Sequence, residues 1–83
     1  MSTLAETDYV LSELQPGERG VVQRITAGES ARQRMLEMGF VPGARVEVVR
    51  VSPFGDPMEV LVSGYHLAIR RRDARCITLW SPV

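Results

Sequence analysis

Ten residues near the middle of the chain decide its fold: Arg34-Met35-Leu36-Glu37-Met38-Gly39-Phe40-Val41-Pro42-Gly43. They are typical of the end of a short helix, a glycine stop and a tight turn into a strand. Glycine readily takes the left-handed conformation that ends a helix, and a proline shortly afterwards cannot continue the helix. We therefore expect Gly39, Pro42 and Gly43 to form a structural turn between a helix and a strand.

The helix that this turn ends is predicted at about residues 31–38. Ser30 and Gln33 fit a capping box, in which the serine hydroxyl accepts a hydrogen bond from the backbone three residues on and the glutamine reaches back. Phe40 is expected to fold back toward Met35 in a Schellman arrangement. A helix of two turns is not stable in isolation, so it must pack against a sheet.

Short runs of alternating apolar residues predict the strands of that sheet. In the first run, alternation places Val21 and Ile25 on one face and Val22 on the other. The run from 46 to 51 is partly apolar on both faces, which favours a curved strand in a closed barrel. Because closure removes most exposed edges, we predict a mainly β fold, a small SH3-like barrel of about five strands with one short α-helix. The strands are expected at residues 21–26, 46–51, 58–63, 66–70 and 76–80, with further structural turns at Gly55, Pro57 and Gly64.

Length and composition limit the class of protein. The chain has 83 residues, a formal net charge of zero and one cysteine. We expect one domain, residues 11–83, behind a flexible N-terminal tail, residues 1–10. A single cysteine excludes an internal disulfide and fits a reducing cytosol. No apolar run reaches the roughly 18 residues that cross a bilayer, so we predict a cytoplasmic protein that does not itself insert into the membrane.

Catalytic and metal sites are not predicted. With one histidine in the chain, the sequence offers no Ser-His-acid or Cys-His pairing, and it has no Walker A loop; we therefore expect neither an enzyme nor a bound cofactor. If the last two strands form a hairpin, His66 and Cys76 lie roughly 13 Å apart along it, too far to share one ion. An ion that bridges two chains through His66 and a carboxylate stays open.

The densest basic cluster comprises Arg70, Arg71 and Arg72, followed by Arg75. Strand alternation points Arg71 away from its two neighbours, so the cluster is not one continuous patch. With zero net charge there is no general attraction to nucleic acid, and we do not expect nucleic-acid binding. A regulatory or nucleic-acid-associated β-barrel that uses Arg70–Arg72 is the alternative function.

A protein-binding surface is the stronger candidate. Phe54 lies at a predicted loop tip between Pro53 and Gly55, where an exposed aromatic side chain would anchor a partner. Prolines on both sides restrict the loop and so limit the entropy lost on binding. Equally consistent with the sequence is a Phe54 folded inward over the end of the barrel. The candidate partner-binding residues are Leu36, Phe40, Phe54, Asp56, Arg70, Arg71 and Arg72.

Three segments resemble the FeoA family, the small cytosolic component of bacterial ferrous iron uptake. They are RQRMLEMGFVPG (32–43), VVRVSPFGDPM (48–58) and LAIRRRD (67–73), and the likeness extends over about residues 11–80. The resemblance implies an SH3-like barrel with a small helical insert and a role in iron transport. It also implies a partner, the membrane permease FeoB with its cytosolic GTP-binding domain, which the chain would bind and modulate at the inner face of the cell membrane. Self-association through an exposed strand edge is left open.

Overall fold

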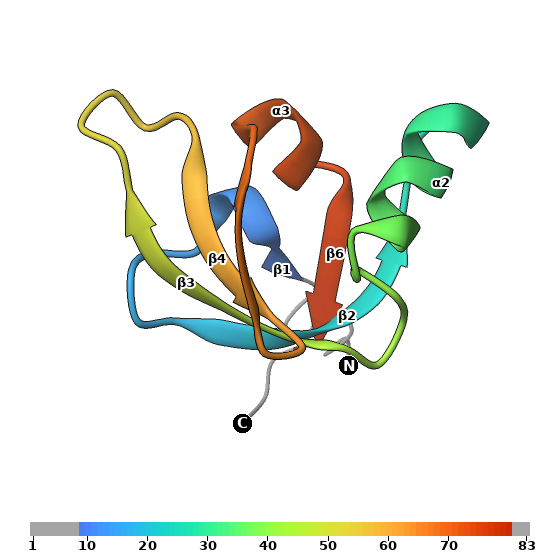
Figure 1. Ribbon diagram of the computed structural model, residues 1–83, viewed down its shortest axis with the longest axis horizontal. Helices are drawn as coiled ribbons and strands as arrows, with labels where there is room; N and C mark the ends of the chain where they lie inside the picture. Colours follow the sequence, from blue (N-terminus) through green and yellow to red (C-terminus); the bar gives the residue numbers. More distant parts are fainter. Residues whose placement is uncertain (1–8, 81–83) are drawn as a thin grey trace, which may run out of the picture.

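The computed structural model describes residues 9–80 of the chain. Over these residues it contains one strongly curved antiparallel sheet with the strand order β1-β6-β2-β3-β4-β5 (Figure 1). The mainly β prediction is confirmed, but the structure has six strands rather than about five, and it has short helical segments besides the predicted helix. The elements are β1 (Tyr9–Val10), η1 (Leu11–Glu13), β2 (Arg19–Ile25), α2 (Glu29–Glu37), β3 (Arg45–Val51), β4 (Met58–Val62), β5 (Tyr65–Ile69), α3 (Arg71–Ala74) and β6 (Ile77–Trp80).

The additional strand, β1, begins two residues before the expected start of the domain at residue 11. Tyr9 pairs with Leu79 and Val10 with Thr78, so β1 extends the sheet beyond β6. A strand of two residues has no periodicity, and the alternation rule therefore cannot detect it. The rest of the predicted tail, residues 1–8, lies outside the described residues.

The alternation predicted for the first strand is wrong. Between Val22 and Arg24 the register of β2 against β6 shifts, as at a β-bulge. One extra residue at a bulge reverses which face the following side chains occupy. Val22 and Ile25 consequently both reach the core, with 1% and 8% of their surface exposed.

The last two strands do not form the predicted hairpin. The helical turn α3 separates β5 from β6, and β6 pairs with β1 and β2 instead. The hairpin that does form joins β4 to β5 through Ser63 and Gly64, which have φ angles of 50° and 88°. Positive φ at both central residues is the signature of the type I′ turn, which fixes the register of a two-residue hairpin.

Helix α2 begins earlier than predicted. Its N-cap is Gly28, which is extended and makes no side-chain cap bond, and Ser30 lies inside the helix. The predicted capping box at Ser30 is therefore wrong. The N–H of Arg32 donates to the carbonyl oxygen of Gly28 at 2.8 Å, and Glu29 places a negative charge in the first turn, where the helix dipole favours it.

The end of α2 is as predicted. Gly39 has a φ of 112°. Its N–H donates to the carbonyl of Leu36 at 3.0 Å, and the N–H of Phe40 donates to the carbonyl of Met35 at 3.1 Å. These two bonds define the Schellman motif. The turn then continues through Gly43, at a φ of 94°, into β3.

The core lies inside the curved sheet, and α2 contributes to it through Met35. None of the helices that the structure describes is long and apolar enough to cross a membrane. The buried apolar side chains are Leu11, Val22, Ile25, Met35, Phe40, Ala44, Val46, Val48, Met58, Val60, Val62, Ile69, Ala74, Ile77 and Leu79.

Candidate protein-binding site

The loop between β3 and β4, residues 52–57, presents Phe54 to solvent. This side chain is 96% exposed, more than Tyr65 at 72% and far more than Trp80 at 46%. Of the two arrangements that the sequence left open, the structure has the exposed one. An aromatic ring held in water has most of its apolar surface available for burial against a partner.

Hydrogen bonds within the loop hold it in one conformation. The hydroxyl of Ser52 donates to the carbonyl of Asp56 at 2.6 Å and accepts from the N–H of Asp56 at 3.1 Å. The N–H of Gly55 donates to the carbonyl of Ser52 at 2.8 Å. These bonds bracket Phe54, so the backbone that carries the exposed ring is restrained before any partner binds.

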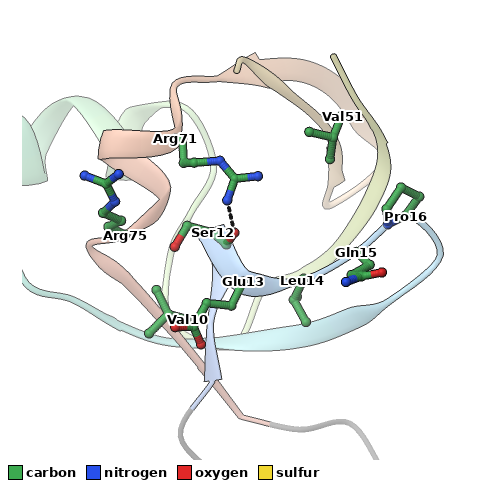
Figure 2. Close-up of a pocket in the computed structure, with 9 residues that line it drawn as sticks. All are labelled: Val10, Ser12, Glu13, Leu14, Gln15, Pro16, Val51, Arg71 and Arg75. Carbon is green, nitrogen blue, oxygen red and sulfur yellow. Dashed lines mark hydrogen bonds between the residues drawn. The ribbon is translucent and has the colours of Figure 1, made fainter. Parts of the chain in front are cut away.

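Arg71 ties this loop to two other parts of the fold. Its Nε donates to the carbonyl of Gly55 at 2.8 Å, and its Nη1 donates to the carbonyl of Ser12 in η1 at 2.5 Å. The second of these bonds is drawn in Figure 2. The backbone N–H of Arg71 donates to Oδ1 of Asp56 at 3.0 Å. Arg71 is one of the predicted partner contacts, and its part-buried guanidinium holds the loop in place.

The remaining predicted contact residues differ in their exposure and in their place in the fold. Asp56 in the loop, Arg70 at the N-cap of α3 and Arg72 within α3 are exposed. Phe40 has no exposed surface, so its predicted role as a partner contact is wrong: the Schellman turn directs it into the core. Leu36 is partly buried on α2, which lies at the opposite side of the molecule from the 52–57 loop (Figure 1).

No metal centre is built from the described residues. Within 9–80 there is no group of three or more His, Cys, Asp or Glu side chains that could hold a metal ion. His66 is exposed on β5 opposite Leu61 of β4. The thiol of Cys76 donates to the carbonyl of Arg72 at 3.8 Å. Because β5 and β6 are not a hairpin, the separation expected for His66 and Cys76 rested on an incorrect pairing.

An open cleft of about 750 Å³ lies between η1 and α3. Figure 2 shows Arg71 and Arg75 along the α3 side and Glu13, Leu14 and Gln15 along the other. Sequence analysis did not predict this cleft. Its lining comes from segments far apart in the chain, and their proximity follows from the pairing of β1 with β6, which had no sequence signal.

Comparison of the sequence with known families gives a match to the FeoA domain over residues 9–79. The chain is 41% identical over 64 residues to the Fe(2+) transport protein A/Fe(2+) transporter FeoB fusion protein of Porphyromonas gingivalis. The matched part is 77% of this chain but only 8% of that much longer protein.

Solved structures give the same result at the level of the fold. The solution structure of FeoA from Chlorobium tepidum superposes with a TM-score of 0.83 at 39% identity, covering 90% of this chain and 71% of that one. The zinc complex of FeoA from Stenotrophomonas maltophilia, described as an SH3 domain protein, superposes with a TM-score of 0.74 at 31% identity, covering 86% and 88%. The predicted SH3-like architecture is therefore confirmed.

Proposed function

The chain belongs to the FeoA family, and on that premise we propose that it is an accessory protein of ferrous iron transport that binds and modulates a FeoB-type permease. The observation that carries the proposal is the Porphyromonas gingivalis relative, in which a segment 41% identical to this chain is covalently joined to FeoB. Fusion keeps two modules at a high effective concentration, which is advantageous when separate chains of the same kinds must meet. We propose the GTP-binding domain on the cytosolic side as the part that is bound.

We propose that Phe54 is the anchor of this complex. Interface energy is concentrated in a few aromatic or arginine side chains that fill pockets on the partner. The internal bonds of the 52–57 loop and the bonds from Arg71 reduce the ordering that binding requires. Around the anchor, exposed Asp56, Arg70 and Arg72 supply a polar rim.

The mechanism that fits such a surface is a population shift. A binding protein changes the activity of its partner only through a difference in affinity for the partner's states. We therefore propose that the Phe54 loop binds one nucleotide state of the permease domain more tightly than the other. This would recruit the chain to the inner face of the cell membrane.

Calorimetric titration of the permease's cytosolic domain, loaded with GDP or with a non-hydrolysable GTP analogue, tests the proposal. Phe54→Ala should weaken binding by about 30-fold, the effect of a hot spot of about 2 kcal/mol. Its melting temperature should hardly move, because the ring is 96% exposed. Tyr65→Ala, which removes the other strongly exposed aromatic ring, is the matched control and should bind like the wild type.

The possible outcomes test the choice of partner and the choice of binding surface independently. If the wild-type chain binds neither nucleotide state, the proposed partner is wrong. If it binds and Phe54→Ala binds equally well, the partner is right and the anchor is wrong.

The nucleic-acid alternative has no observation in its favour. Arg71 is the central residue of the basic cluster, and its guanidinium donates hydrogen bonds to the carbonyls of Gly55 and Ser12. Arg70, Arg72 and Arg75 are left as the exposed cations of the cluster, on a chain of zero formal net charge. Phosphate-tracking surfaces need several clustered cations.

A further inference from the structure

Strand β5 presents an unpaired edge. It is the last strand in the sheet order, and among residues 9–80 no strand pairs with its far side. Unpaired edges attract other strands, and proteins usually guard them with lysine, proline or a bulge. The segment Tyr65–Ile69 has none of these: it contains no lysine or proline, and its register against β4 is unbroken.

The type I′ turn determines which backbone groups face outward. Residues that flank a two-residue hairpin form a hydrogen-bonded pair, and pairs then alternate along the strands. Val62 and Tyr65 are that first pair, so Leu67 and Ile69 also bond to β4. The N–H and C=O groups of His66 and Ala68 therefore point away from the sheet, and both residues are exposed.

The edge is complementary to itself. In an antiparallel arrangement centred on Leu67, His66 of one copy lies opposite Ala68 of the other, and the outward groups of the two residues exchange four hydrogen bonds. Leu67, which is partly buried, then faces Leu67 of the other copy, a cross-strand apolar pair. The exposed Tyr65 lies opposite Ile69, whose side chain is already buried in its own core. No like charges are opposed anywhere in this register.

We propose that two copies of this chain associate through β5 in this register, forming a continuous sheet across a two-fold axis. A second copy is favoured as the occupant because the formal net charge of zero removes the overall repulsion that keeps many proteins monomeric. This inference goes beyond the proposed function and does not depend on the permease.

Two matched variants test the pairing by sedimentation equilibrium of the full chain. His66→Arg/Ala68→Arg puts arginine opposite arginine, and His66→Glu/Ala68→Glu puts glutamate opposite glutamate. Each variant alone should dimerise about tenfold more weakly than the wild type. An equimolar mixture of the two should regain at least wild-type association, because opposite charges then face each other. Thermal unfolding of each variant checks that the fold is retained.

Amide hydrogen exchange locates the contact in the unmodified protein. Exchange at His66 and Ala68 should slow as protein concentration rises, while Tyr65 and Leu67, already bonded to β4, should not change. A wild-type chain that stays monomeric at millimolar concentration would overturn the proposal, as would a mixture of variants that does not recover association. Protection of His66 and Ala68 that is independent of concentration would also overturn it, because the edge would then be covered within one chain.

Discussion

Arg71 illustrates how one residue determines the geometry of a surface it does not itself present. Its side chain bonds to carbonyls in η1 and in the 52–57 loop, and its N–H bonds to Asp56. Lysine has a single charged nitrogen and no planar fork, so it cannot serve both carbonyls in the same way. The position therefore needs two donor nitrogens at fixed spacing, which arginine supplies. A lysine of the same charge does not supply them.

Arg71→Lys should lower the free energy of unfolding by about 1–3 kcal/mol, the cost of leaving part-buried carbonyls without their donor. It should also weaken binding of the permease domain, because the loop that carries Phe54 loses its restraint. Denaturant unfolding and calorimetric titration measure the two effects. Arg72→Lys, at an exposed position, is the control and should change stability by less than about 0.5 kcal/mol. Equal effects at both positions would contradict the role assigned to Arg71.

Among the elements, α2 shows most clearly what sequence can predict. Its end was predicted because Gly39 and Pro42 act through local backbone geometry, and the Schellman bonds of Gly39 and Phe40 follow from that geometry. Its start was misplaced because glycine as well as serine can cap a helix, and the capping-box pattern of Ser30 and Gln33 favoured the later residue. The strand faces after Val22 and the pairing of β6 were missed for another reason: a bulge and a two-residue strand leave no periodic signal.

Gly39→Ala should destabilise the chain by about 1–2 kcal/mol, because an L-residue is strained at a positive φ. An added Cβ would lie 3.8 Å from the side chain of Val62, an ordinary contact, so the loss measures backbone strain and not overlap. Gly28→Ser is the control in the same helix. The backbone at Gly28 is already extended and nothing lies within 4 Å of an added Cβ, so a serine cap should leave stability unchanged or raise it by a few tenths of a kcal/mol. Chemical denaturation measures the free energy of unfolding of both variants. A Gly39→Ala chain as stable as the wild type would count against the Schellman geometry.

The whole molecule has little stability to spare. A domain of 83 residues is expected to have a free energy of unfolding of about 4–12 kcal/mol. Among the described residues, five of the fifteen buried apolar side chains are valines, and Phe40 is among the largest of those that are fully buried. The loss of one large core side chain therefore threatens the fold as a whole, whereas the loss of the exposed Phe54 does not.

Phe40→Ala should lower the free energy of unfolding by about 3–5 kcal/mol. If the stability of the wild type lies at the lower end of the expected range, a large fraction of the molecules is then unfolded at 37 °C. The fraction that stays folded should bind the permease domain with wild-type affinity, since Phe40 has no exposed surface. Unfolding curves combined with titration at low temperature separate the two quantities. A Phe40→Ala chain that is stable but does not bind would restore Phe40 to the contact surface.

The bonds from Arg71 also affect the point during synthesis at which the chain can bind a partner through the Phe54 loop. Ser12 and the 52–57 loop leave the ribosome before α3 does, and the bonds that join them through Arg71 cannot form until that residue follows. A nascent or prematurely terminated chain that stops before α3 carries the aromatic ring on a loop that is held only by its own internal bonds. Because of the order of translation, the 52–57 loop is fully held only when nearly the whole barrel has emerged from the ribosome. This limits binding of a partner by incomplete chains.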